Sequence, residues 1–139
     1  MVDKAVLAAK TAAVRDAVSR VREVLPQTPE ALAADRSARE IVVLNLFVAL
    51  QECVNLAAHW LADDGRAVPA DYRGVFLALC EADVIPRPLA ERLAAASGFR
   101  NLVAHRYGVL DPRRVYRIAR EDLGDLVEFC AALAERAGA

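Results

Sequence analysis

Residues 41–60, IVVLNLFVALQECVNLAAHW, form the longest strongly apolar segment of the chain and indicate its architecture. Apolar side chains occur on nearly every side of a helix drawn through it, whereas a surface helix carries a single apolar stripe. This pattern predicts the central, most buried helix, which begins at Thr28-Pro29-Glu30 and runs to about Leu61. Its start combines a capping hydroxyl, a proline in the first turn and an acid at the positive end of the helix dipole.

The rest of the chain also predicts helices and no strand. Ala, Leu, Arg and Glu dominate, which are good helix formers, and no stretch alternates apolar and polar residues. We expect further helices over about Asp3–Leu25, after a cap at Asp71, from near Pro88, and from Asp111-Pro112 onward. Short connections favour antiparallel neighbours, so the predicted fold is an all-α bundle of about five helices, forming one domain over residues 1–139.

The first of these helices is expected to pack through one apolar stripe. Residues at spacings of three and four define this stripe. They are Val6, Ala9, Ala13, Ala17, Val21 and Val24.

Composition excludes several classes of protein. With 56% apolar residues and a net charge of −1, the chain is neither disordered nor basic overall. No apolar run reaches the length of a membrane span, and no signal-peptide core follows the N-terminus, so we expect a cytoplasmic protein without a membrane segment. The three cysteines favour reduced, buried thiols, and the only two histidines, His59 and His105, have no metal-site spacing.

Residues 99–107, FRNLVAHRY, gather unusual polar chemistry in an alanine- and leucine-rich chain. Asn101 and His105 are four residues apart and share a helix face. Arg100 and His105 are five apart, so on a regular helix they diverge by about 140° and one helix presents them poorly to a single substrate. Two copies related by a two-fold axis would bring both groups into one cleft, which predicts a homodimer with a composite site.

These residue types suit the cleavage of an RNA phosphodiester without a metal. The RNA 2′-hydroxyl is a built-in nucleophile, and His105 titrates near neutral pH, so it can take or give a proton. Arg100 offers a charged, planar fork to the phosphate oxygens. Asn101 either orients the imidazole or binds phosphate.

Positive charge is concentrated around this segment. Six arginines and one acid fall between Arg100 and Arg120, although the whole chain is slightly acidic. This concentration indicates a phosphate-binding surface. The alternative is a solvated helix face whose arginine stems cover apolar surface. The candidate phosphate contacts are Arg106, Arg113, Arg114 and Arg117.

The spacing of Arg100, His105 and Tyr107, with a polar residue after the arginine, resembles the signature of the HepT-like branch of HEPN-domain proteins. These are the toxins of type II HEPN/MNT toxin–antitoxin pairs. The similarity extends over about residues 5–135. Its flanking segments are Gln51–His59, Pro69–Tyr72, Phe76–Leu79, Val109–Asp111 and Val115-Tyr116. The chain departs from the family pattern at Asn55, where an acid is frequent.

The resemblance implies a helical homodimer acting as a metal-independent ribonuclease on RNA. It also implies a partner, an MNT-type nucleotidyltransferase antitoxin, which transfers AMP from ATP to the tyrosine that matches Tyr107. The attached phosphate would then compete with RNA for Arg100. The chain itself would need no cofactor, because ATP and magnesium belong to the antitoxin.

Other interpretations of the same residues stay open. The bundle is alternatively a non-catalytic nucleotide- or polynucleotide-binding module associated with a minimal nucleotidyltransferase, or a purely structural dimerisation bundle. His105 alternatively caps a helix end, and Tyr107 packs on the bundle. The amides of Asn45, Gln51 and Asn55 need partners, either across a dimer or in the cleft, and His59 is either a satisfied histidine or part of the cleft lining.

Overall fold

The structure, a computed structural model, describes residues 2–106 and 110–138, without the side chains of residues 101, 102 and 104–106. In those ranges it contains seven helices and no strand, which confirms the all-α fold. The helices are α1 (Lys4–Val24), α2 (Pro29–Ala34), α3 (Arg36–Asp63), α4 (Tyr72–Glu81), α5 (Arg87–Arg106), α6 (Pro112–Glu121) and α7 (Leu123–Arg136).

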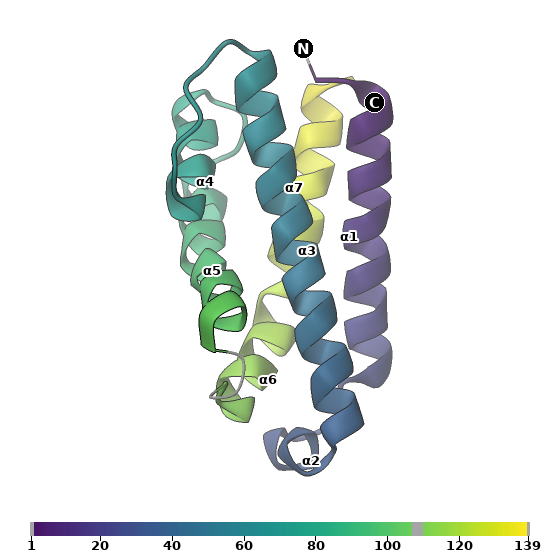
Figure 1. Ribbon diagram of the computed structural model, residues 1–139. Coiled ribbons are helices and arrows are strands. Elements are labelled where there is room, and N and C mark those ends of the chain that lie inside the picture. The colour runs from purple at the N-terminus through teal and green to yellow at the C-terminus, as the bar shows by residue number, and fades with distance from the viewer. Residues whose placement is uncertain (1, 107–109, 139) are drawn as a thin grey trace.

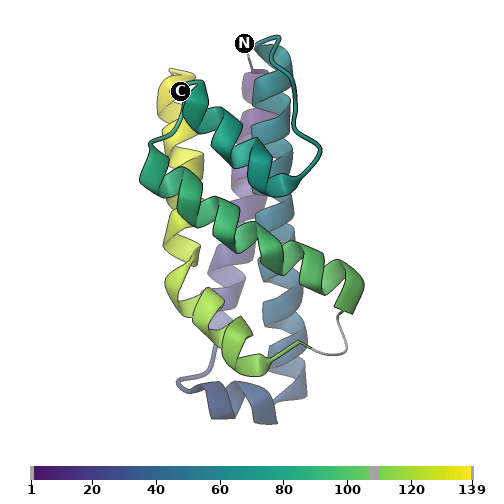
Figure 2. The same ribbon diagram turned by 90° about the vertical axis from the view of Figure 1, so that its left-hand side faces the viewer.

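Three long helices form the body of the molecule. α1, α3 and α7 lie side by side, and α1 runs opposite to the other two (Figure 1). α4 and α5 form an antiparallel hairpin that crosses this layer obliquely (Figure 2). α2 and α6 contact each other at the far end of the bundle from the start of α1. Since α3 contacts each of the other six helices, it is the central helix that the sequence predicted.

Much of α3 is covered on all sides. Leu46, Leu50 and Leu56 are almost completely buried, and Phe76 and Phe129 meet nearby edge to face, with ring centroids 5.5 Å apart. Contrary to expectation, α3 has the length and composition of a membrane span. Half of its most apolar window is buried inside the bundle, however, so a core helix accounts for its hydrophobicity and the described chain has no clear membrane-protein character.

The count of about five helices was too low because two predicted helices are interrupted at aspartates. At Asp35 the backbone is extended, with φ −111° and ψ 99°, and its carboxylate accepts the Ala38 N–H at 3.0 Å, so it ends α2 and caps α3. Asp122 separates α6 from α7 differently, because its backbone is in the right-handed helical region, with φ −101° and ψ −11°, and its side chain makes no capping hydrogen bond.

The predicted helix starts are confirmed where a cap was recognised. Thr28 Oγ1 accepts the Ala31 N–H at 3.1 Å, and Asp111 accepts the Arg113 N–H at 2.9 Å. Asp71 caps α4 by accepting from Gly74.

The buried stripe of α1 is rotated from the predicted one. Ala17 and Val21 belong to both, but Ala9 is exposed, and Leu7, Val14 and Val18 are buried instead. Alanines on several faces give α1 more than one weakly apolar stripe. The face with the larger side chains is buried because it removes more apolar surface from water.

Candidate functional site

Arg100 is held by two other helices at the C-terminal part of α5. Its Nε–H donates to Oε1 of Gln51, on α3, at 2.8 Å. Its guanidinium carbon lies 4.6 Å from the ring centroid of Tyr72, on α4, and 5.6 Å from that of Phe47, on α3. Both distances are in the range of cation–π attraction. Arg100 therefore occupies one defined position instead of extending freely into solvent.

Polar side chains continue from Arg100 across α3 to α1. The Gln51 amide nitrogen donates to Asn55 Oδ1 at 2.9 Å, and the Asn55 amide nitrogen lies 3.4 Å from Glu52 Oε1. Lys10 on α1 pairs with Glu52 Oε2 at 3.0 Å. The two α3 amides thus have partners within one subunit.

The sequence did not predict four side chains that contact Arg100 or are joined to it through Gln51 and Asn55, namely Phe47, Tyr72, Glu52 and Lys10. The sequence does indicate that Phe47, Gln51 and Asn55 share one face of a helix, because they are four residues apart. Nothing in the local sequence connects this face to Arg100, which is 49 residues from Gln51.

The other residues of the motif lie at the end of α5. The backbone is helical through Arg106, so Asn101 and His105 are on one helix with Arg100. The side chains of Asn101, His105 and Arg106 are not described, and Tyr107 lies outside the described residues.

Three of the four candidate phosphate contacts lie on α6. Val115, Tyr116, Ile118 and Ala119 are buried, while the arginines are exposed on the opposite face. This basic face of α6 consists of Arg113, Arg114, Arg117 and Arg120.

These arginines have different surroundings. Arg113 lies 3.9 Å from the Glu30 carboxylate across exposed surface. Arg114 and Arg117 line a cavity of about 250 Å³ between α5 and the α6–α7 junction, with Asp122 at its edge. Phosphate contacts along α6 would therefore be spread over a face and not gathered at one point.

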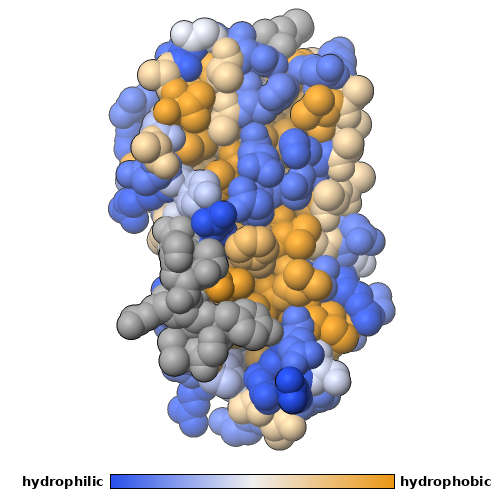
Figure 3. All heavy atoms as spheres, in the orientation of Figure 1, coloured by the Kyte–Doolittle hydropathy of each residue, from blue (hydrophilic) through white to orange (hydrophobic). Residues whose placement is uncertain are grey.

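One face of α3 is left open beside Arg100. Leu44 is 60% exposed, and Ile41 and Val48 next to it are only partly buried. Apolar side chains gather over the N-terminal half of α3 (Figure 3). Gln51 and Asn55 continue the same face toward the C-terminus of the helix, because residues three, four and seven apart align. We call this surface the open face of α3.

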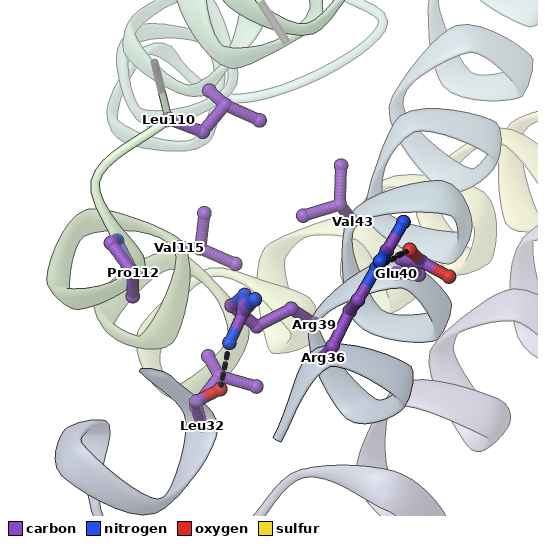
Figure 4. A pocket seen from close by; sticks show the side chains of 8 residues that line it. All are labelled: Leu32, Arg36, Arg39, Glu40, Val43, Leu110, Pro112 and Val115. Atoms are coloured by element: carbon purple, nitrogen blue, oxygen red, sulfur yellow. Dashed lines mark hydrogen bonds and ion pairs between the residues drawn. The ribbon is translucent and has the colours of Figure 1, made fainter. Parts of the chain in front are cut away.

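A second cavity, of about 260 Å³, lies between α2, α3 and α6 (Figure 4). Its charged groups serve the local fold: Arg36 pairs with Glu40 at 2.8 Å, and Arg39 donates to the carbonyls of Leu32 and Ala33 at the end of α2. The cavity is therefore accounted for by the packing of the three helices that meet there. Its apolar lining comes from Leu32, Val43, Leu110 and Val115.

His59 belongs to α3 and contacts a residue one turn further on. Its Nε2 lies 3.3 Å from the Asp63 carboxylate, and its side chain is 38% exposed. This contact within one helix favours a structural histidine over a member of the site.

The fold is that of the toxin subunit in solved toxin–antitoxin complexes. A tri-AMPylated Shewanella oneidensis HEPN toxin in complex with MNT antitoxin superimposes with a TM-score of 0.86 at 24% identity, covering 97% of this chain and 99% of that chain. A toxin–antitoxin structure with AMP-PNP gives 0.86 at 22% identity, covering 94% and 98%. A cytosolic Bacillus subtilis protein of unknown function gives 0.82 at 12% identity, covering 97% and 90%.

Comparison at the level of sequence identifies the family, which the fold alone does not. The model of the ribonuclease HepT-like family matches residues 14–133, so the chain belongs to that family of ribonucleases. The mRNA nuclease HepT of Shewanella oneidensis is 25% identical over 120 residues, which is 86% of this chain and 90% of the relative. A relative from Archaeoglobus fulgidus is 31% identical over 116 residues, covering 84% and 86%.

Proposed function

We propose that this ribonuclease is the toxin of a HEPN/MNT toxin–antitoxin pair and that it cleaves RNA without a metal, in the cytoplasm. The observation that carries this proposal is the Arg100 guanidinium, fixed by α3 and α4 on the helix that also carries His105. Family membership supports the choice of RNA as substrate.

The reaction uses the substrate's own nucleophile. One histidine, His105, accepts the proton of the 2′-hydroxyl, the 2′-oxygen attacks phosphorus, and the bond to the 5′-oxygen breaks. His105 of the second copy supplies the proton that the leaving oxygen needs. Arg100 neutralises the charge that develops on the phosphate oxygens, and Asn101 orients the imidazole or binds phosphate.

Residues five apart diverge on a regular helix, and the backbone of α5 is helical through Arg106, so we expect Arg100 and His105 to reach one phosphate only in a dimer. The open face of α3 supports this assembly. It adjoins Arg100 through Gln51, and Leu44 exposes an apolar side chain that a second copy would cover. The basic face of α6, with Arg106, would extend contact along the RNA backbone.

The partner in this proposal is an MNT-type antitoxin that transfers AMP to Tyr107. The tyrosine oxygen attacks the α-phosphorus of ATP, pyrophosphate leaves and the phenolic proton is released. ATP and magnesium are bound by the antitoxin, and the chain needs no cofactor of its own. The fold shared with an AMPylated toxin in complex with an MNT antitoxin supports this assignment.

The test is RNA cleavage by purified protein in the presence of EDTA. We expect cleavage, and we expect His105→Ala and Arg100→Ala each to lower its rate at least about 100-fold. Arg66→Ala, in the exposed loop after α3, is the matched control and should cleave normally. Undiminished cleavage by His105→Ala would overturn the proposal. RNA binding without cleavage would favour the non-catalytic binding module.

A further inference from the structure

We propose that Gln51 is a positioning residue for Arg100, and that its lack of charge is essential because it fixes the guanidinium without neutralising it. This inference rests on the proposed function, in which Arg100 meets a phosphate. It assigns a role to a side chain of α3 that does not itself touch the substrate.

The contacts to Arg100 leave the phosphate-binding end of the side chain open. Gln51 accepts the Nε–H, and the guanidinium carbon lies over the rings of Tyr72 and Phe47, which offer no hydrogen-bond acceptor of the kind that would occupy a terminal nitrogen. Among the described residues, neither terminal nitrogen has a hydrogen-bond acceptor. A guanidinium has five N–H donors, so the four on the terminal nitrogens stay available as a fork for phosphate oxygens.

The orientation of the Gln51 amide is determined by its neighbours. Its nitrogen faces Asn55 Oδ1 and its oxygen faces Arg100, whereas the flipped amide would set donor against donor and acceptor against acceptor. Asn55 is oriented in turn because its nitrogen lies toward Glu52. A chain of hydrogen bonds thus runs from Arg100 through Gln51 and Asn55 to Glu52, and we call it the relay. It presents an acceptor to Arg100 from a fixed direction.

Negative charge is kept away from Arg100 by the same relay. The nearest carboxylate in it belongs to Glu52, which is separated from Arg100 by two neutral amides and is paired with Lys10 at 3.0 Å. A carboxylate at position 51 would form an ion pair with Arg100 and compete with the substrate phosphate. Among the described residues, the three groups that contact Arg100 are uncharged, so none of them neutralises the charge that would meet RNA.

Two substitutions of Gln51 test separately the hydrogen bond that positions Arg100 and the absence of charge at position 51. Gln51→Met keeps the volume and removes the acceptor, so we expect kcat for RNA cleavage to fall about 10- to 100-fold with a smaller change in KM. Gln51→Glu keeps the acceptor and adds charge. We expect it to raise KM at least about tenfold and to make RNA binding less salt-dependent, lowering the slope of log Kd against log salt by about one per Arg100 engaged.

Asp125→Asn is the matched control, because it breaks an ion pair of α5, with Arg92 at 3.0 Å, that lies outside the relay. It should leave both kcat and the salt slope unchanged. The salt slope is the decisive measurement, since a loss of packing alone does not change the number of phosphate contacts.

The inference is overturned if wild-type protein cleaves RNA and both Gln51 variants cleave and bind as wild type does, a result that leaves the proposed function intact. Failure of the wild type to cleave counts against the proposed function instead, and the salt slope of RNA binding then still tests the effect of charge at position 51. If Gln51→Met does not fold, Gln51→Leu removes the same acceptor from Arg100 with a different apolar side chain. It should also lower kcat, and an unchanged kcat would contradict the inference.

Discussion

Arg100 and Arg113 show how differently two arginines of one basic segment are placed. Arg100 is partly buried and contacts two rings and an amide. Arg113 is 79% exposed and lies 3.9 Å from the Glu30 carboxylate, whose side chain is 72% exposed, so solvent screening leaves this ion pair little energy. A phosphate that meets Arg100 therefore finds a fixed and partly desolvated charge, whereas along α6 it meets mobile charges on a helix surface.

Asp122 gives a prediction about pH and stability. Its burial, followed by the charges of Asp125 and Glu121, raises the pKa of its carboxyl, and Arg117 only partly opposes them. As pH rises, the unfolded chain loses this proton first, so stability falls until the folded carboxyl has also ionised. Asp122→Asn should therefore raise Tm by about 2 °C at pH 7 and leave it unchanged near pH 3, as measured by calorimetry. A gain that persists at pH 3 would refute this account.

The cysteines should differ in reactivity. Cys53 and Cys130 are completely buried, and their mutual hydrogen bond, followed by burial, raises the pKa of the Cys53 thiol well above its usual value. The same hydrogen bond lowers the pKa of the Cys130 thiol, so burial and not its pKa protects Cys130. Iodoacetamide at pH 8 should therefore modify only the half-buried Cys80 in native protein and all three cysteines in urea. Intact-mass spectrometry measures both states. Rapid native modification of Cys53 would contradict the structure.

At the scale of helices, α3 has different roles along its length. Asp35 starts it and Arg39 ties it to the carbonyls at the end of α2. Its buried residues then form the core, and its open face carries first the exposed Leu44 and further on the amide that holds Arg100. One helix thus joins the core, the proposed dimer surface and the candidate site. A disturbance of α3 should therefore affect stability and cleavage together.

Two glycine-to-alanine substitutions in helices should have opposite effects. A Cβ at Gly74 would lie 2.6 Å from the Asp71 carboxylate that caps α4 and 2.9 Å from Pro69, whereas a Cβ at Gly98 in α5 meets nothing within 4 Å. Gly74→Ala should lower the free energy of unfolding by about 1 kcal/mol through loss of the cap. Gly98→Ala should raise it by about 0.5–1 kcal/mol, because alanine favours the helix interior. Urea denaturation checks both, and equal signs would refute the assignment.

At the scale of the whole molecule, the open face of α3 and the roles proposed for Arg100 and His105 both favour a homodimer. The face leaves a large apolar side chain in water next to the polar relay. Burying apolar surface is the main driving force of association, so a second copy on this face would gain stability and bring a second α5 to the cleft.

This assembly can be tested with two aspartate substitutions. Leu44→Asp should convert a dimer into monomers in sedimentation experiments and lower RNA cleavage at least about tenfold, because a charge cannot be buried without a partner. Val68→Asp is the matched control: Val68 is 43% exposed but lies in the loop between α3 and α4, so it should remain dimeric and active. Dimers of Leu44→Asp would place the interface elsewhere.

Prediction from the sequence succeeded where the interactions involved are local. Caps such as Thr28, Asp71 and Asp111 act over two or three residues, and the apolar pattern of residues 41–60 is long enough to identify the central helix. It failed at Asp35, because a favourable cap and a continuing helix have similar local sequences, and at Asp122, where no side-chain cap marks the break. Neither break changes the fold class.

The sequence by itself determined that this protein is helical, which segment is central, and that Arg100, Asn101 and His105 occupy one helix. Helix propensity, capping and periodicity depend on neighbours within about four residues, and all of these are present in the sequence. Only the tertiary structure decided which face of α1 is buried and which side chains hold Arg100. Those outcomes depend on contacts between distant segments, such as the hydrogen bond across 49 residues from Arg100 to Gln51, which form only when the helices pack.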